Sequence, residues 1–152
     1  VYKRQEKFIR RTVELAAAAR EKGNEPFGAL LVRNGEVVLE AENTQIVDRD
    51  ITGHAETNLV RKGWKELGPE ILAECTLYTS TEPCAMCCGA IYWAGIPRMV
   101  FGCSAETLYG ITGGGLHTPS AELFARGDRE VAVTGPVLEE EALKVHEGYW
   151  ED

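Results

Sequence analysis

The sequence predicts an α/β fold, a three-layer α/β/α sandwich in which helices cover both faces of a central five-stranded mixed sheet. Three observations support this prediction. Segments with helical and strand periodicity follow one another in the order α-β-β-α-β-α-β-(loop)-β-α, which is typical of layered α/β proteins. The 152 residues are 44% hydrophobic and 26% charged, a globular composition. No linker, repeat or low-complexity segment divides the chain, so we expect a single domain over residues 1–152.

The first half of the chain is expected to form a helix, a hairpin and a second helix. Apolar residues recur at helical spacing in the first segment, and Gly23 marks its end. Asn34-Gly35 separates two apolar runs, and this dipeptide is the strongest short hairpin signal. The predicted elements are a helix over 3–22, strands over 28–32 and 36–42, and a helix over about 54–67.

The second half is expected to continue with alternating strands and helices. Pro83 suits the first turn of a helix, where its missing N–H costs nothing. The Gly- and Thr-rich residues 103–120 are expected to be irregular, and Pro136 is expected to open the last helix. The predicted elements are strands over 75–80, 97–102 and 129–135, and helices over 83–94 and 136–150.

Charge and cysteine content narrow the function classes. The formal net charge of −8 argues against a nucleic-acid partner, because phosphate contacts require basic surface. No apolar run approaches the ~20 residues of a membrane span, and no signal-peptide pattern opens the chain. The five cysteines are an odd number crowded into one third of the sequence. We therefore expect a reduced, cytoplasmic protein whose cysteines serve a metal or reactivity.

A histidine and two cysteines have the spacing of a metal site. Cys84 and Cys87 stand at i and i+3 at a helix start, where the helix dipole favours the thiolate that binds metal. His54 also stands at a helix start, so the two starts are expected to converge. One imidazole and two thiolates leave tetrahedral zinc one open position, which water can occupy. Glu56, two residues after His54, is expected to carry protons beside that position.

The pattern H-x-E followed by P-C-x-x-C is the signature of zinc nucleobase deaminases. In that pattern and its surroundings the sequence resembles the cytidine and deoxycytidylate deaminase-like superfamily, in its branch acting on free bases, such as guanine and cytosine deaminases, and on tRNA adenosine. The matching segments span residues 26–102 at the spacing of the family. They are PFGALLV, AENTQ, HAE at 54–56, TSTEPCAMCCGAIYWAGI at 79–96, and RMVFG.

The resemblance implies a cytidine deaminase-like fold and hydrolytic release of ammonia from an amino-heterocycle. It implies one Zn²⁺ per subunit with one water or hydroxide, held by His54, Cys84 and Cys87. Glu56 would be the catalytic proton shuttle. The pocket residues that it implies are Asn43 hydrogen-bonded to the ring, Phe27 packed against it, and backbone groups of Ala55, Thr81 and Glu82.

The C-terminal residues GYWED resemble the aromatic and acidic segment that closes the pocket in the free-base branch. This resemblance implies that Trp150 stacks on the base and that Glu151 or Asp152 accepts a hydrogen bond from it. The alternative is that Tyr149 and Trp150 only dock the last helix.

Other interpretations of the metal motif remain open at this point. A closed structural zinc site would take a fourth ligand from another cysteine or histidine, and a redox-active CxxC pair would need no metal. Cys75, Cys88 and Cys103 fit buried apolar positions better. His117 and His146 are expected at the surface. A deaminase-fold binding protein would not need Glu56.

The substrate classes are ranked by the residues outside the motif. Guanine comes first, because PFGA and AIYWA most resemble guanine deaminases, with cytosine, isocytosine or related rings beside it. A tRNA adenosine deaminase is next, although CSAETLYGITGGG and the acidic C-terminal segment replace that branch's usual sequences. A free nucleoside is third. The expected partners are a small-molecule base and a second copy of the chain, a homodimer supported by apolar Ile91, Trp93 and Ile96, with no membrane contact.

Overall fold

The computed structural model of the protein describes residues 2–151 and consists of helices packed around one sheet. The helices are α1 (Tyr2–Glu21), α2 (Ala55–Glu66), α3 (Pro69–Leu72), α4 (Ala85–Ala94), α5 (Ala105–Thr112), α6 (Ser120–Phe124) and α7 (Glu139–Lys144). The strands are β1 (Gly28–Arg33), β2 (Glu36–Glu42), β3 (Thr76–Thr81), β4 (Arg98–Cys103) and β5 (Ala132–Thr134).

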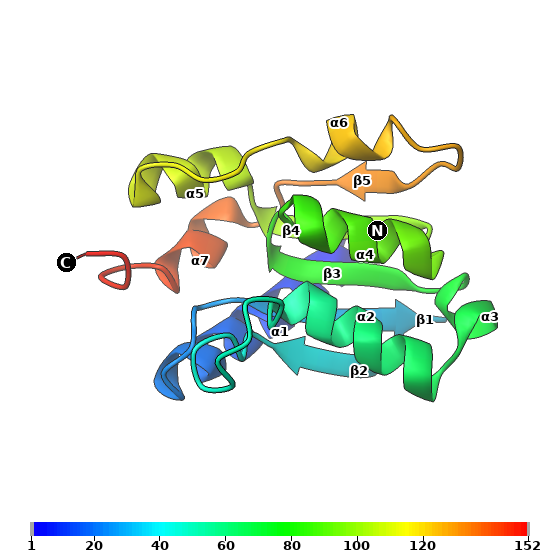
Figure 1. The fold of residues 1–152 in the computed structure, drawn as a ribbon, viewed down its shortest axis with the longest axis horizontal. Helices are drawn as coiled ribbons and strands as arrows, with labels where there is room; N and C mark the ends of the chain where they lie inside the picture. Colours follow the sequence, from blue (N-terminus) through cyan, green and yellow to red (C-terminus); the bar gives the residue numbers. More distant parts are fainter. Residues whose placement is uncertain (1, 152) are drawn as a thin grey trace.

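The five strands form a mixed sheet in the order β2-β1-β3-β4-β5 (Figure 1). β1 pairs antiparallel with both β2 and β3, whereas β3, β4 and β5 run parallel. The turn at Asn34-Gly35 has positive φ at both residues, 52° and 78°, as a two-residue hairpin requires. The predicted five-stranded mixed sheet is therefore confirmed.

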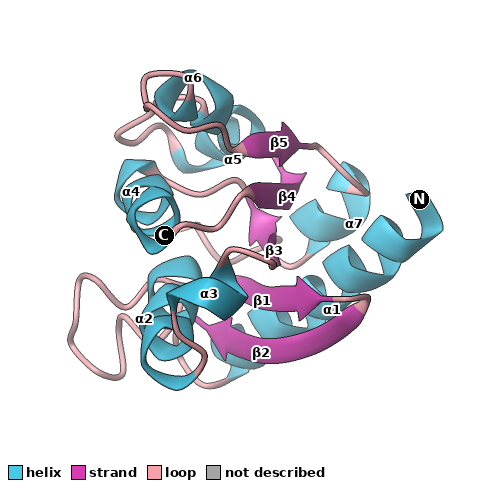
Figure 2. Cartoon of the chain, turned by 90° about the vertical axis from the view of Figure 1, so that its right-hand side faces the viewer, coloured by secondary structure: helices cyan, strands magenta, loops and turns pink. Residues whose placement is uncertain are grey.

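Helices cover both faces of the sheet and create two separate cores (Figure 2). α1 and α7 pack on one face, and α2 and α4 pack on the other. Side chains alternate between the faces along a strand, so Leu30 lies in the core under α1 while Leu31 lies under α2 and α4. The three-layer sandwich is also confirmed.

Close packing of α1 on β1 depends on Gly28. A Cβ atom at this position would lie 2.5 Å from the carbonyl oxygen of Thr12 and 2.6 Å from the Cβ of Leu15. Only glycine permits this approach. The contact fixes the α1–β1 loop, residues 22–27, at the end of the sheet where β3 and β4 finish.

Several sequence-based boundaries are wrong in the C-terminal third. Within the expected irregular segment 103–120, residues 105–112 instead form α5, which begins after Ser104, whose Oγ accepts a hydrogen bond of 3.1 Å from the Thr107 N–H, whereas residues 113–119 lie in no helix or strand. This N-cap is a start signal that the glycines at 113–115 obscured. The last helix spans only 139–144, and β5 only 132–134; α3 was not predicted.

No helix within residues 2–151 combines the length and the apolar character that crossing a membrane demands.

Candidate active site

A histidine and two cysteines meet where two helices begin. His54 is the N-cap of α2, Cys84 is the N-cap of α4, and Cys87 lies in the first turn of α4. Nδ1 of His54 lies 3.5 Å from Sγ of Cys84 and 3.6 Å from Sγ of Cys87. The three ligand atoms all lie within 4.8 Å of one another.

These distances fit a tetrahedral zinc ion. Zn–S bonds of about 2.3 Å and a Zn–N bond of about 2.0 Å, at tetrahedral angles, place nitrogen and sulfur about 3.5 Å apart. Among the described residues, no fourth Cys, His, Asp or Glu side chain joins the group. The hydroxyl of Thr57 contacts Sγ of Cys87 at 3.2 Å and orients it from outside the group. The arrangement therefore suits zinc with three protein ligands and one open position.

The charges of the three groups are set by their mutual contacts. The hydrogen bond with Cys87 is the main reason that the pKa of Cys84 falls to about 4, and His54 lowers it further. The same contact with Cys84 raises the pKa of Cys87 well above its usual value. The pKa of His54 is raised, mainly by its hydrogen bond with Cys84. Cys84 is thus a thiolate at neutral pH, the form that binds metal.

Glu56 lies beside this group in the first turn of α2. Its side chain is only 5% exposed. Burial raises the pKa of Glu56 to about 7, and the negative charge of Cys84 adds to the effect. A carboxyl group with a pKa near neutrality can both accept and donate a proton at physiological pH.

A cavity of about 240 Å³ opens over the metal-ligand group. His54, Glu56 and Cys84 form part of its wall, so two of the three predicted metal ligands and the predicted proton carrier face one space, whereas Cys87 is buried behind it. The other lining residues are Glu25, Phe27, Thr81, Glu82, Ala105, Leu108, Tyr109, Thr112, Gly114 and Trp150. We call residues 54–57 and 84–87 the zinc frame.

The rest of the wall comes largely from two segments that we call the cap, residues 105–114 and 145–151. Leu108 and Tyr109 of α5 line the cavity opposite the zinc frame. Trp150 lines it from the C-terminal segment and packs against the same apolar cluster as Leu108. Residues 103–119 therefore contribute a pocket wall, a role that the sequence left undecided.

Trp150 is held by a buried histidine. Its indole Nε1–H donates a 3.0 Å hydrogen bond to Nδ1 of His146, and Nε2 of His146 lies 3.1 Å from the hydroxyl of Thr81. Because Nδ1 accepts, the neutral ring carries its proton on Nε2 and donates to Thr81. His146 is 2% exposed, so the expectation of a surface position is wrong. Burial lowers the pKa of His146 to about 4, with a smaller contribution from Arg20.

Arg20, near the end of α1, ties the same C-terminal segment to the body of the protein. Its guanidinium donates hydrogen bonds to the carbonyls of Val145 and Glu147, at 3.0 and 2.6 Å. The guanidinium also lies 5.5 Å from the ring centre of Tyr149. These contacts hold Trp150 over the cavity.

The remaining predicted substrate residues fall into two groups. Phe27 and Trp150 line the cavity, with ring centres 6.1 Å apart. Ala55 and Asn43 are buried and are not among the lining residues. Oδ1 of Asn43 accepts from the Gln45 N–H at 2.9 Å, and its Nδ2 has no partner among the described residues.

The acidic end of the chain is placed differently from the expectation. Glu151 is exposed and does not line the cavity that His54 and Glu56 line. Asp152 lies outside the described residues.

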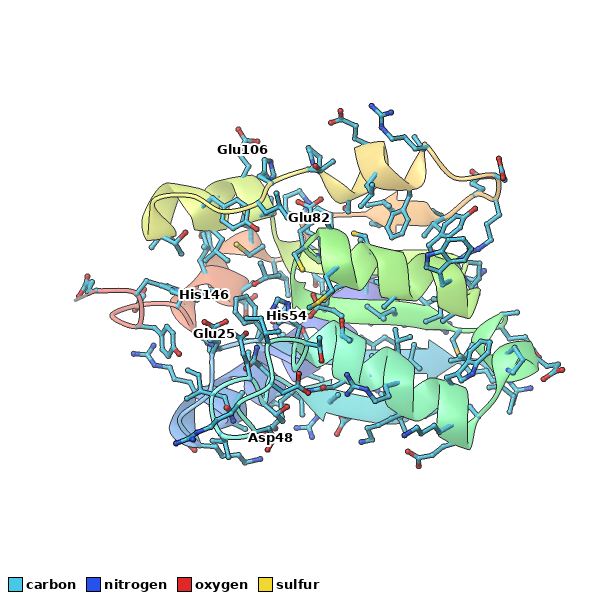
Figure 3. All side chains as sticks on the ribbon, viewed as in Figure 1. Glu25, Asp48, His54, Glu82, Glu106 and His146 are labelled. Atoms are coloured by element: carbon cyan, nitrogen blue, oxygen red, sulfur yellow. The ribbon has the colours of Figure 1, made fainter. Side chains whose placement is uncertain are left out.

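Sequence reasoning missed several residues of this site. Among them, Glu25 and Tyr109 line the cavity, and His146 and Arg20 hold the C-terminal segment. Glu25 and His146 are labelled in Figure 3. Of these four residues, only Glu25 carried a signal, since it immediately precedes the recognised PFGA segment. The others depend on contacts between distant parts of the chain.

The sequence profile of one protein family matches the part of the chain that builds this site. The family is described as the cytidine and deoxycytidylate deaminase zinc-binding region, and the match covers residues 2–103. The chain belongs to this family. It is a zinc-dependent aminohydrolase with one zinc ion per subunit.

Three relatives place this deaminase within the family. It is 38% identical over 149 residues to a probable cytosine deaminase of Schizosaccharomyces pombe, covering 95% of this chain and 91% of the relative. It is 45% identical over 103 residues to a guanine deaminase of Bacillus subtilis, covering 67% and 65%. A tRNA-specific adenosine deaminase of Bacillus subtilis is 34% identical over 136 residues, covering 90% and 82%.

Solved structures show the same fold. A guanine deaminase from Nitrosomonas europaea superposes with a TM-score of 0.84 at 23% identity, over 95% of this chain and 83% of that one. A structure from a study of tRNA:A34 deaminases superposes with a TM-score of 0.77 at 29% identity, over 91% and 97%. The expected cytidine deaminase-like fold is therefore confirmed.

Family membership decides between the interpretations of the CxxC motif. A purely redox pair and a closed structural zinc site are both inconsistent with a zinc aminohydrolase whose cluster has three ligands. The other three cysteines, Cys75, Cys88 and Cys103, are each at most 1% exposed, as expected for apolar filling.

Proposed function

We propose that this deaminase removes the exocyclic amino group of a free nucleobase by hydrolysis, with guanine as the first candidate and cytosine or isocytosine as the second. The observation that carries the proposal is the cavity of about 240 Å³ over the zinc frame. Pockets for drug-sized ligands usually span about 300–1,000 Å³, so this space suits a single small heterocycle.

The lining of the cavity supports a neutral ring with N–H groups. Three carboxylates, Glu25, Glu56 and Glu82, face it, and no lysine or arginine is among the lining residues described. An acidic wall repels phosphate and attracts N–H donors. The aromatic rings of Phe27, Tyr109 and Trp150 offer flat apolar faces to a base.

We propose that His54, Cys84 and Cys87 hold the zinc ion and that the open position faces the cavity. A bound zinc ion supplies a Lewis-acid centre that lowers the pKa of water toward ~7. The protein must then bring the amino-bearing carbon to that centre and move protons around it.

Glu56 is proposed to move those protons. Its carboxylate takes a proton from the attacking water and gives it to a ring nitrogen, so that the ring carbon accepts the oxygen. Glu56 then delivers the second water proton to the departing amine, and the C–N bond breaks to release ammonia. Its pKa of about 7 suits both directions of transfer.

Ring recognition is assigned to three residues. Phe27 and Trp150 offer aromatic surfaces against which the base packs. Asn43 is 1% exposed, and its Nδ2 is a buried donor without a partner among the described residues. Since such donors are rare in folded proteins, we assign Nδ2 to a ring acceptor or carbonyl of the substrate.

The substrate is tested by ammonia release from the zinc-loaded protein with guanine, cytosine, isocytosine and adenosine in an anticodon stem-loop RNA. We expect turnover of at least one free base and none of the RNA. Turnover of the RNA alone would refute the proposal and favour the second candidate function, tRNA adenosine deamination. That candidate has one observation in its favour, the relative that is 34% identical over 136 residues.

A homodimer and a cytoplasmic location are also proposed. Trp93 is 82% exposed and Trp64 is 51% exposed, and both border an apolar groove between α2 and α4. A second copy of the chain would cover this groove. Light scattering on the wild type and on Trp93→Lys tests the homodimer, because a wild-type monomer would refute it.

The cytoplasmic location is supported by the cysteines. All five are free thiols, as in a reducing compartment.

A further inference from the structure

The three carboxylates that line the cavity differ in their hydrogen-bond partners. Glu82 is fully engaged by the protein. Its Oε1 accepts from the Ala105 N–H at 3.0 Å, and its Oε2 accepts from the N–H and hydroxyl of Ser120 at 2.8 and 2.5 Å. Glu56 is buried beside the zinc frame, where we place proton transfer. Glu25 is the third carboxylate.

The side chain of Glu25 makes no hydrogen bond and no ion pair within residues 2–151, although it is half-buried in the wall of the cavity. The nearby cation Arg20 donates instead to the carbonyls of Val145 and Glu147. In the view of Figure 3, Glu25 lies near His54 and His146, whereas Glu82 lies farther from it. A partly desolvated acceptor without a donor is incomplete until a ligand supplies one.

The backbone around Glu25 is fixed, so the carboxylate is held in place before any ligand binds. The Asn24 N–H donates to the Ala19 carbonyl at 2.9 Å, and Oδ1 of the 3% exposed Asn24 accepts from the Val47 N–H at 2.9 Å. The Glu25 carbonyl accepts from the Phe27 N–H at 2.9 Å, across Pro26, whose ring restricts φ. These hydrogen bonds and the proline ring restrict the backbone on both sides of Glu25.

We propose that Glu25 is a specificity-determining residue, whose carboxylate accepts a hydrogen bond from the ring N–H that a free base carries and a nucleoside lacks. The inference rests on the proposed function and narrows its substrate class. In a nucleoside the sugar replaces that hydrogen, so the carboxylate would be left desolvated and unpaired. A site built to bind an N–H rejects ligands without one far more strongly than a hydrophobic pocket rejects a missing methylene.

The position of Glu25 differs from that of Glu151, the acidic residue near the end of the chain. Glu151 is exposed and outside the cavity, whereas Glu25 reaches the cavity from the α1–β1 loop beside Phe27. The structure thus assigns recognition of the N–H edge to the N-terminal side of the pocket, and packing over the ring to the cap.

The test uses two pairs of substrates that differ by one methyl group on the sugar-bearing nitrogen: guanine with 9-methylguanine, and cytosine with 1-methylcytosine. kcat/KM is measured for the wild type, Glu25→Met, which keeps the length of the side chain without an oxygen acceptor, Glu25→Ala and the control Glu21→Gln, together with zinc content. Glu21 is an exposed glutamate at the end of α1 that does not line the cavity. The control therefore makes the same change of charge nearby without touching the ligand.

We expect the wild type to prefer the unmethylated base of at least one pair by about 10- to 100-fold, the strength of a hydrogen bond to a charged group. Glu25→Met and Glu25→Ala should lower kcat/KM for that base by about 10-fold or more and bring the ratio close to one. Zinc content should not change, and Glu21→Gln should keep the wild-type ratio.

Four results would overturn the inference. An equal loss on both members of a pair would mean a structural role, and no loss would mean no contact. A ratio that collapses in Glu25→Ala but not in Glu25→Met, which has similar length and no oxygen acceptor, would mean that the side chain only excludes the methyl group sterically. Wild-type protein that releases ammonia from no free base would overturn the proposed function as well, which separates the two failures.

Discussion

The zinc frame and the cap line the same cavity, but they are built in opposite ways. The frame comes from two short motifs, each at the start of a helix, and its ligand atoms lie 3.5 to 3.6 Å apart. The cap depends on contacts between segments far apart in the sequence, such as Trp150 on His146 and His146 on Thr81. Chemistry is thus fixed by local sequence, and the shape of the pocket by long-range packing.

This difference explains how relatives with different substrates can share the motif. The family match covers residues 2–103, which include the whole zinc frame and none of the cap. The alignments with relatives named for cytosine, guanine and tRNA adenosine are 149, 103 and 136 residues long, so each of them includes the zinc frame. Changes to the frame should therefore abolish the reaction, whereas changes to the cap should alter which ring is accepted and how tightly it is held.

The largest expected effect comes from removing a ligand of the frame. Cys84→Ala should lose both zinc and turnover, because two remaining protein ligands do not make a stable tetrahedral site. Metal analysis after gel filtration and ammonia release measure the two losses. A variant that kept one zinc ion per chain and its activity would show that Cys84 is not a ligand.

Removing only the proton carrier should separate metal binding from catalysis. Glu56→Gln keeps the shape of the side chain but cannot take a proton from water. We expect turnover to fall by about 10²- to 10⁴-fold while the zinc content stays at the wild-type level. Full ammonia release with intact zinc would refute the proposed role.

A change in the cap should have a smaller effect on turnover and none on the metal. Trp150→Ala removes a face on which the base packs, and base–aromatic stacking is worth about 1–3 kcal/mol. We expect a loss of about 10- to 100-fold in kcat/KM. Trp150→Phe, which retains a ring, should recover most of it. Wild-type activity in Trp150→Ala would mean that the residue only docks the tail.

The smallest expected effect is on stability in mild acid. The pKa of His146 is lowered by burial to about 4 in the folded protein, from the ordinary value of 6.5 that holds in the unfolded chain, so the unfolded state binds the proton first. Stability therefore falls as the pH drops below 6.5. Between pH 7 and pH 6 the loss from this residue is about 0.7 kcal/mol. Urea unfolding with saturating zinc measures how the free energy of unfolding changes between pH 7 and pH 6. The decrease should be smaller in His146→Gln than in the wild type, and an equal decrease in the two proteins would contradict the prediction.

Much of the fold follows from local sequence signals. Asn34-Gly35 predicts the first hairpin, and short apolar runs bounded by turn residues predict the strands. The motifs at His54 and Cys84 lead to the zinc frame for the same reason, since both motifs lie at helix starts.

The cap could not be predicted in this way. Glycines 113–115 follow α5 closely and made its residues look irregular, although Ser104 caps the helix. His146 and Arg20 gain their roles from partners in other parts of the chain, Thr81 and Val145 among them. No spacing within a short segment encodes such contacts. Glu25 is similar, because only the folded loop shows that its carboxylate faces the cavity.

The five thiols differ in pKa, so the loss of zinc could be detected by alkylation of a single cysteine. Burial raises the pKa of Cys75 and Cys88, and raises that of Cys103 to about 12, while the pKa of Cys84 is about 4. Without zinc, one sulfur in five would be ionised and reachable from the cavity. Iodoacetamide should therefore label metal-free protein at a single cysteine, Cys84. The labelled fraction would report how many chains of a stored enzyme have lost zinc, and Cys84 would be the first thiol to be oxidised in them.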